Sequence, residues 1–321
     1  YMPAIIYTTH AGPELGNAFA DVISGRYSPA GRLAQTWYKS KYELAPIECY
    51  NIIENDMTYL YYRGKPLYPF GYGLSYAKFE YSDFDVKENG DVISVLLDVT
   101  NVSETDSDEV VQIYFRMENP SVKRPLRQLV AFAREHIKGG SKRHFEFDIK
   151  KSELRFYDVS RERFAVEQGR YTFMAGASSE DIRLTKTIDV SGEKIPPREL
   201  CKGIKAKNYD GKYGAKMKYS KKSEQHYMLG GGLIYNNCVL GDADSIEIVC
   251  GSRVNTGKIT VRYGGETLCE AEVKPTVDVT KFETVTAQFD KAVLAGIDRE
   301  KPAVFELWMP EQIYILGFRT Y

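Results

Sequence analysis

The chain has 321 residues, of which 43 are Lys or Arg and 44 are Asp or Glu, so its formal net charge at pH 7 is −1. This balance provides no overall field that would attract nucleic acid or an anionic membrane surface. No stretch approaches the roughly 18 continuous apolar residues of a membrane-spanning helix. At roughly 150 residues per domain the length predicts about two domains, and we expect neither a membrane nor nucleic acid as a partner.

A short apolar strand and an amphipathic helix are predicted at the start of the chain. The strand covers residues 3–7, and the helix has Pro13 at its start and Gly25 past its end. Its apolar residues fall on one helical face: Leu15, Ala18, Phe19, Val22 and Ile23. One strand and one helix cannot form a core, because a buried strand of this kind needs neighbours on both edges. We therefore expect residues 1–40 to be the remnant of an α/β sandwich that belongs to a longer polypeptide.

Residues 41–77 are predicted to form a connector. Residues 65–76 read KPLYPFGYGLSY, with two prolines and two glycines among aromatic side chains. Proline lacks a backbone donor and glycine tolerates positive φ, so this composition favours a fixed, packed segment over a helix or a ladder strand. Tyr59, Tyr61 and Tyr62 lie just before it, and we interpret them as packing residues in preference to a substrate subsite.

This connector resembles the segment that joins the α/β sandwich domain to the fibronectin type III-like domain in glycoside hydrolase family 3, the β-glucosidases and β-xylosidases. The resemblance covers about residues 1–190, because further stretches agree in order and spacing: residues 16–25, 28–38, 109–114, 124–129 and 169–179. Ala34 departs from a usual proline, and Ser103 lies near a usual glycine. The resemblance implies a longer protein that is a retaining β-glycosidase, with a nucleophilic carboxylate and an acid about 5 Å apart. Neither residue matches a position in this chain.

Short runs of alternating apolar residues are predicted to form a fibronectin type III-like β-sandwich at residues 78–190. Alternation at period two is typical of half-buried strands, and turn sequences separate several of the runs. Four strands are marked by these residues: Ile93, Val95, Leu97 and Val99; Val111, Ile113 and Phe115; Phe145, Phe147 and Ile149; Tyr171, Phe173 and Ala175. Pro196, Pro197 and a rise in lysine then predict a linker at residues 191–203.

Residues 204–321 are predicted to form a second sandwich. Strands are expected at residues 204–210, 231–235, 245–249, 257–263 and 313–319, and their order resembles carbohydrate-binding module family 6, a jelly roll. The whole chain is thus predicted to be mainly β: a remnant of an α/β sandwich, a fibronectin type III-like β-sandwich and a jelly-roll β-sandwich.

The second resemblance implies a sugar-binding site. In such modules aromatic rings stack on a pyranose and an amide binds its hydroxyls. Tyr235 and Phe282 match the ring positions, and Asn236 or Asn237 can supply the amide, although an aromatic residue in a strand is more often part of the core. The glutamate and aspartate that hold calcium in this family are replaced by Lys207 and by Gly317 or Leu316, so we predict no calcium.

No motif for catalysis is recognised. The chain has no P-loop, dinucleotide fingerprint, Ser-His-Asp order or HExxH helix, so we predict no cofactor and no catalytic residue. Asp83 follows a serine and precedes Phe84, like the nucleophile motif of family 3, but it comes directly after the connector and is interpreted as a coincidence.

The remaining polar and thiol residues are given structural explanations. Basic residues and tyrosines between 194 and 224 suggest a nucleic-acid groove, but a solvated linker and strand explain them without a nucleic-acid fold. The five cysteines show no C-x-x-C pair, which favours reduced thiols and a cytoplasmic compartment while leaving one disulfide among the last four open. The four histidines are expected to be exposed or capping.

Three hypotheses for function remain. The first is the C-terminal accessory part of a family 3 β-glycosidase, whose partners are the missing N-terminal catalytic domains and a plant-type oligo- or polysaccharide, xylan or β-glucan. The second is a stand-alone carbohydrate-binding protein, and the third is a purely structural accessory.

Overall fold

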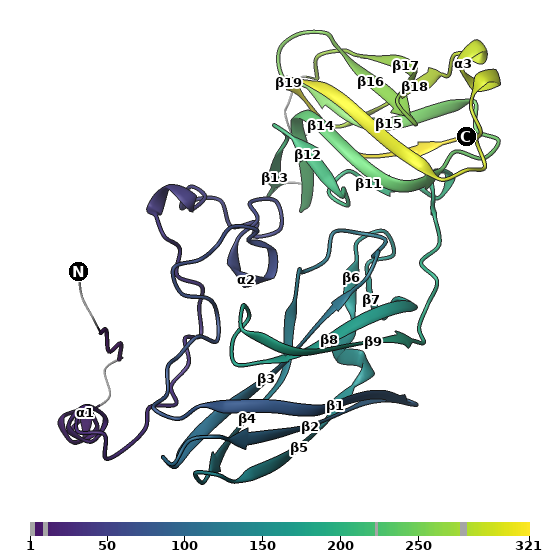
Figure 1. Ribbon diagram of the computed structural model, residues 1–321. Helices are drawn as coiled ribbons and strands as arrows, with labels where there is room; N and C mark the ends of the chain where they lie inside the picture. Colours follow the sequence, from purple (N-terminus) through teal and green to yellow (C-terminus); the bar gives the residue numbers. More distant parts are fainter. Residues whose placement is uncertain (1–3, 9–11, 222–223, 277–280) are drawn as a thin grey trace. The chain divides into compact units, whose positions relative to one another are not determined.

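The structure, a computed structural model, describes residues 4–8, 12–221, 224–276 and 281–321 (Figure 1). The chain divides into two compact units. Unit 1 contains residues 1–155 and 166–192, and unit 2 contains residues 156–165 and 193–321. In the described residues, strands predominate and no helix is both long and apolar enough to cross a membrane.

Unit 1 contains a β-sandwich of two antiparallel sheets. One sheet has the order β1-β2-β5, and the other has the order β4-β3-β8-β9. Their bounds are β1 Phe79–Asn89, β2 Val92–Asn101, β3 Ser107–Met117, β4 Gln128–Ile137, β5 Lys142–Lys150, β8 Gly169–Gly176 and β9 Ile182–Val190. The predicted alternation is confirmed in β2, where every second residue from Ile93 to Val99 is fully buried. The other three marked strands are confirmed as β3, β5 and β8.

In the described residues, unit 2 contains a 10-stranded sheet whose inward side chains form an apolar core. The main path is β10-β14-β19-β15-β18, with β11 and β16 also pairing with β19, β12 and β13 pairing with β14, and β17 pairing with β16. The bounds are β10 Arg198–Glu199, β11 Ile204–Lys205, β12 Gly211–Tyr213, β13 Lys216–Ser220, β14 Gln225–Val239, β15 Ser245–Ser252, β16 Gly257–Tyr263, β17 Glu266–Val273, β18 Glu283–Gln288 and β19 Ala303–Thr320. A short helix, α3 (Lys291–Gly296), begins at Asp290, whose side chain accepts a hydrogen bond from Ala292 N.

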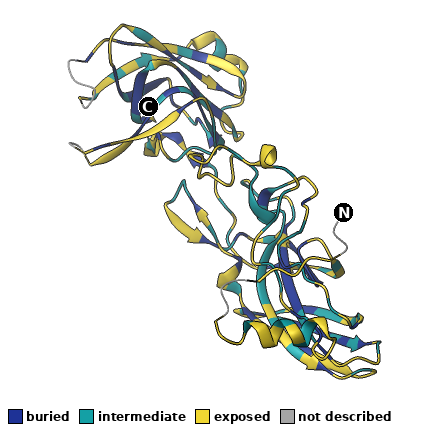
Figure 2. Ribbon diagram, turned by 90° about the vertical axis from the view of Figure 1, so that its left-hand side faces the viewer, coloured by how far each residue is buried: buried dark blue, intermediate teal, exposed yellow. Residues whose placement is uncertain are grey.

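Each unit has its own apolar core. Unit 1 buries the inward residues of both its sheets, including Leu97 and Phe173. Unit 2 buries the inward residues of β14, β15, β16 and β19, including Ile248 and Leu307. Figure 2 shows these buried residues along the strands of each unit.

A hairpin from the middle of the chain belongs to unit 2. Strands β6 (Phe156–Asp158) and β7 (Arg163–Ala165) pair with each other. Glu162 at the tip of this hairpin bonds Lys205 Nζ at 2.8 Å and Asn208 Nδ2 at 3.2 Å. In the sequence analysis this segment fell inside the predicted fibronectin type III-like domain. The bonds from Glu162 to Lys205 and Asn208 join residues 43 and 46 positions apart, and no local sequence pattern indicates them.

Residues expected in a linker are part of the sheet and the core of unit 2. Arg198 and Glu199 pair in parallel with Cys238 and Val239 of β14, and the 3₁₀ helix η3 (Leu200–Lys202) follows. Leu200 is fully buried in the core. A two-residue parallel strand carries too little alternation to be recognised in a sequence.

The N-terminal helix is confirmed as α1 (Leu15–Ile23), but it buries no residue. The predicted strand at residues 3–7 is wrong for its described part, since residues 4–8 lie outside any strand. Ile5 is 57% exposed, Ile6 50% and Ile23 69%. A strand needs a neighbouring strand in a sheet, and none of the described strands pairs with residues 4–8.

Candidate functional site

The connector of unit 1 is held to the sandwich by buried hydrogen bonds. The Gln112 side-chain amide donates to the Gly71 carbonyl oxygen at 3.1 Å and to that of Ala177 at 2.7 Å. The Tyr114 hydroxyl in turn donates to Gln112 Oε1 at 2.6 Å. Gly71 has a φ of 80°, and a Cβ there would collide with Gln112 Oε1. Glycine is required at this position both for its backbone conformation and for the close approach.

A buried ionic cluster fastens a turn before the connector to β3. Arg32 Nη2 lies 3.0 Å from Glu109 Oε2, and the Tyr81 hydroxyl donates to Glu109 Oε1 at 2.8 Å. The Glu109 side chain is 2% exposed and that of Arg32 is 10% exposed. Burial raises the pKa of Glu109, and the Arg32 charge and the Tyr81 hydrogen bond offset part of this effect. The cluster is a structural device of unit 1.

Asp83, which resembles a nucleophile motif in sequence, lies in a bulge of β1. The register with β2 shifts between Ser82 and Asp85, and Asp83 has a φ of 53°. Its side chain is 70% exposed, and Lys142 Nζ lies 3.6 Å from its Oδ2. Aspartate adopts positive φ more readily than most residues, so this position has a structural explanation.

The structure does not bring the predicted sugar-binding rings together. Tyr235 is fully buried, its hydroxyl donates to the Ala206 carbonyl oxygen at 2.9 Å, and its ring packs edge-on against Phe318. A ring with no exposed face cannot stack on a sugar, so this part of the predicted site is corrected. Phe282 is half-buried in a different ring cluster, edge-on to Tyr227 and Tyr314.

The amide candidates lie at an irregularity of β14. The register with β19 shifts between Tyr235 and Cys238, and Asn237 has a φ of 54°. The half-buried Asn236 donates its backbone N–H to Asp210 Oδ2 at 2.7 Å. The alternation of Leu233 and Tyr235, both inward, is the sequence feature that indicates a core position for Tyr235. Sugar binding by unit 2 stays a prediction, and it needs other residues.

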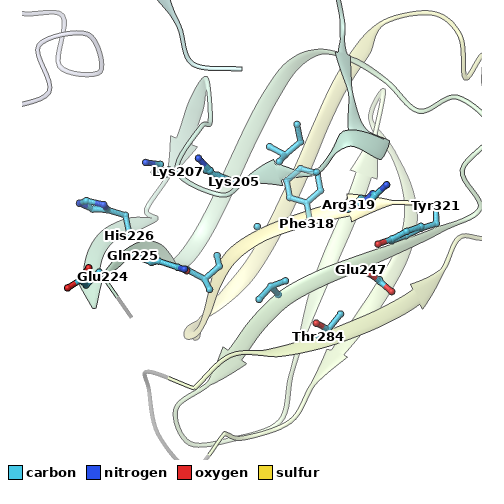
Figure 3. A pocket seen from close by; sticks show the side chains of 15 residues that line it. Lys205, Lys207, Glu224, Gln225, His226, Glu247, Thr284, Phe318, Arg319 and Tyr321 are labelled. Carbon is cyan, nitrogen blue, oxygen red and sulfur yellow. The ribbon is translucent and has the colours of Figure 1, made fainter. Parts of the chain in front are cut away.

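A groove of about 780 Å³ lies on unit 2 where β11, β19, β15 and β18 run side by side (Figure 3). Gly317 lies at its centre, paired with Lys205 of β11 and Val249 of β15. A Cβ on Gly317 would lie 2.5 Å from the Ile204 carbonyl oxygen, so glycine is needed for β11 to approach. Figure 3 shows Gln225 and His226 at one end and Tyr321 at the other.

The walls of the groove carry charged side chains of both signs. The lining includes Lys205, Lys207 and Arg319 as cations and Glu224 and Glu247 as anions. Lys205 is already bonded to Glu162. The charges of the lining nearly balance, so the groove does not select strongly for an anion or a cation. Sequence reasoning missed this site, because its side chains come from strands that are far apart in the chain.

Two family matches cover much of unit 1. Residues 1–76 match the glycosyl hydrolase family 3 C-terminal domain, and residues 109–179 match the fibronectin type III-like domain. The first match ends at residue 76, one residue before the predicted end of the connector. The order of the two matches agrees with the resemblance found in the sequence.

Curated relatives and solved structures are glycosidases. Thermostable beta-glucosidase B of Acetivibrio thermocellus is 34% identical over 196 residues, which cover 56% of this chain and 26% of that protein. Xylan 1,4-beta-xylosidase of Xylanibacter ruminicola is 35% identical over 186 residues, covering 57% of this chain and 21% of that protein. The crystal structure of beta-glucosidase from Kluyveromyces marxianus in complex with glucose has a TM-score of 0.52 and 32% identity, and covers 55% of this chain and 23% of that chain.

The chain spans about a quarter of the length of these curated relatives. The matched residues 1–76 and 109–179 are therefore similar to the C-terminal region of glycoside hydrolase family 3 enzymes, where the family's C-terminal domain precedes a fibronectin type III-like domain.

Proposed function

We propose that this chain is the C-terminal accessory region of a retaining family 3 β-glycosidase that hydrolyses β-glucosides or β-xylosides. The observation that carries the proposal is the order of the two family matches along the chain. Residues 1–76 match the glycosyl hydrolase family 3 C-terminal domain, and residues 109–179 match the fibronectin type III-like domain. The two catalytic carboxylates, about 5 Å apart in a retaining enzyme, would belong to a part of the same polypeptide upstream of Tyr1.

The exposed apolar surface of the N-terminal segment supports this role. α1 has an apolar face but buries none of its residues, and Ile5, Ile6 and Ile23 are at least half exposed. Burying such side chains stabilises a fold by about 1.5–3 kcal/mol each. We propose that the segment completes an α/β sandwich whose other strands and helices come from the upstream part.

Unit 1 would act as a brace for that sandwich. The Arg32–Glu109 pair and the Gln112 hydrogen bonds fix the turn and the connector to the fibronectin-like sheets. A rigid attachment of this kind would hold the upstream domain in one orientation relative to the brace.

We propose that unit 2 is a jelly roll that keeps a plant polysaccharide near the active site and so raises its effective concentration.

The proposal is tested by hydrolysis of nitrophenyl β-glucoside and nitrophenyl β-xyloside. Two proteins are compared: this chain alone, and a polypeptide extended upstream through its full reading frame. Activity in the extended polypeptide only is the expected result. Activity in the 321-residue chain by itself would contradict the proposal, because it would require a carboxylate pair within these residues.

A further inference from the structure

We propose that the groove centred on Gly317 in unit 2 binds a neutral oligosaccharide chain, with Tyr321 as the ring on which a sugar unit stacks. The choice of a plant-type β-linked sugar chain rests on the proposed function. The location of the site does not, because it follows from the shape, the exposed ring and the polar groups of the groove.

The groove crosses strands instead of following one. Lys205, Gly317, Val249 and Thr284 are successive cross-strand neighbours on β11, β19, β15 and β18. Val249 is half-buried, and Gly317 adds no side chain, so the middle of this row is low and apolar while its ends are polar. The volume of about 780 Å³ lies within the roughly 300–1,000 Å³ of small-ligand sites.

Tyr321 is a ring held in a fixed orientation at one end of the groove. Its backbone N–H donates to the Ser245 carbonyl oxygen at 3.0 Å, and its own carbonyl oxygen accepts from Asp244 N at 2.7 Å. The Arg319 guanidinium carbon lies 4.9 Å from the ring centroid. Tyr321 remains 49% exposed. An exposed ring with a fixed backbone loses little conformational freedom when it stacks on a sugar.

Glu247 also orients the tyrosine. Its carboxylate accepts a hydrogen bond from the Tyr321 hydroxyl, which raises the pKa of that phenol. Arg319 is itself anchored, because its Nε donates to the Cys201 carbonyl oxygen at 2.6 Å. The ring, the guanidinium and the carboxylate therefore form one preorganised wall.

The polar groups of the groove include both donors and acceptors. Glu247 and Glu224 accept, Lys207 and Arg319 donate, and the Gln225 amide does both. Sugar hydroxyls each donate and accept, so they match such a mixture. Because the charges nearly balance, a neutral polyol suits this site better than a phosphate or a carboxylate ligand. His226, packed against Tyr219 at 4.9 Å between ring centroids, borders the end opposite Tyr321.

The test is isothermal titration of the full 321-residue chain with cellohexaose and xylohexaose. Binding of at least one is expected. Tyr321→Ala should weaken it roughly tenfold, the loss expected for one stacking ring, and Glu247→Gln should weaken it to a smaller extent. Tyr213→Ala is the matched control, because Tyr213 is an exposed tyrosine of unit 2 outside the groove lining. The Tyr213→Ala variant should bind the sugars with the same affinity as the unmodified chain.

Three outcomes would overturn the proposal. The first is that neither sugar gives a heat of binding. The second is that the unmodified chain and the Tyr321→Ala chain bind with equal affinity. The third is that Tyr213→Ala weakens sugar binding and Tyr321→Ala does not. Thermal melting of each variant shows that unit 2 remains folded. Hydrolysis by the upstream-extended polypeptide is measured separately. Failed binding with intact hydrolysis would remove the groove and the polysaccharide-holding role of unit 2, and would leave the assignment to a family 3 β-glycosidase standing.

Discussion

At the scale of single residues, the Arg32–Glu109 pair is the most sensitive point of unit 1. Both side chains are nearly buried and lie 3.0 Å apart. Replacing Arg32 by Met would leave the Glu109 carboxylate without its charged partner. We expect Arg32→Met to lower the free energy of unfolding by about 3–5 kcal/mol at pH 7, measured by urea denaturation.

The penalty of Arg32→Met should become smaller at acid pH. Burial already raises the pKa of Glu109, and loss of the Arg32 charge raises it further. The folded variant then holds a proton that the unfolded chain releases, so stability contributed by the protonated carboxyl is lost as pH rises through the folded pKa. The Arg32→Met, Glu109→Gln double variant should be more stable than Arg32→Met at pH 7. If Arg32→Met lowered the free energy of unfolding by less than about 1 kcal/mol at every pH, Arg32 would not be the charged partner that stabilises the buried Glu109 carboxylate.

The five cysteines should differ in reactivity. All are free thiols; Cys49 and Cys201 are exposed, Cys238 and Cys250 are buried, and Cys269 is partly buried. Burial raises the pKa of Cys238 and of Cys250 to about 12 and that of Cys269 to about 11. Since the thiolate is the reactive form, we expect a thiol-disulfide reagent to label two cysteines quickly in the native protein. A Cys49→Ser, Cys201→Ser variant should lose the fast phase, and a third rapid thiol would contradict the burial.

At the scale of elements, β14 depends on a glycine at its first irregularity. The register with β19 shifts between Leu229 and Gly231, where Gly231 has a φ of 74°. A Cβ on Gly231 would collide with the Tyr213 carbonyl oxygen and Ala215 N, both backbone atoms, whereas a Cβ on Gly241, with a φ of 61°, meets nothing within 4 Å. The two positions share the conformational strain and differ in the clash.

We therefore expect Gly231→Ala to destabilise unit 2 more than Gly241→Ala. The control should cost about 1–2 kcal/mol from the left-handed conformation alone, and Gly231→Ala should add roughly 1–3 kcal/mol for the overpacking. Chemical denaturation of both variants measures the difference. Equal losses would show that β14 can shift away from β12 without penalty.

Local patterns predicted the regular strands, and contacts distant in sequence set the limit. Period-two alternation located β2, β3, β5 and β8 because each has one buried face. A short apolar run also predicted a strand at residues 3–7, but its described residues, 4–7, lie outside any strand. The groove was not predicted, because Lys205, Glu247 and Tyr321 become neighbours only through the pairing of β11, β15 and β19.

The misplaced ring shows the same limit at finer detail. Tyr235 has the residue type of a sugar-stacking position, yet it lies inward with Leu233 on β14. Residue type alone cannot separate a core ring from a binding ring, whereas the facing direction of the strand does. Tyr321, outside the stretch that resembles a strand, gave no pattern at all.

At the scale of the whole molecule, each unit should unfold as its own cooperative body. The cores of unit 1 and unit 2 consist of separate residue clusters. We expect two transitions in differential scanning calorimetry. Leu97→Ala and Ile248→Ala, each a fully buried position, should cost about 2–5 kcal/mol and shift one transition each. A single transition that moves with both substitutions would contradict two independent cores.

The position of β19 sets the order in which unit 2 can be completed during synthesis. Residues 303–320, which form β19, pair with β11, β14, β15 and β16. These four strands therefore need β19 as a sheet partner, and β19 is translated after all of them. Unit 1 has all its strands by residue 190 and can close while the ribosome is still translating. The earlier strands of the unit 2 core keep apolar side chains uncovered until residues 303–320 emerge, so chaperones have most opportunity to bind unit 2 in that interval.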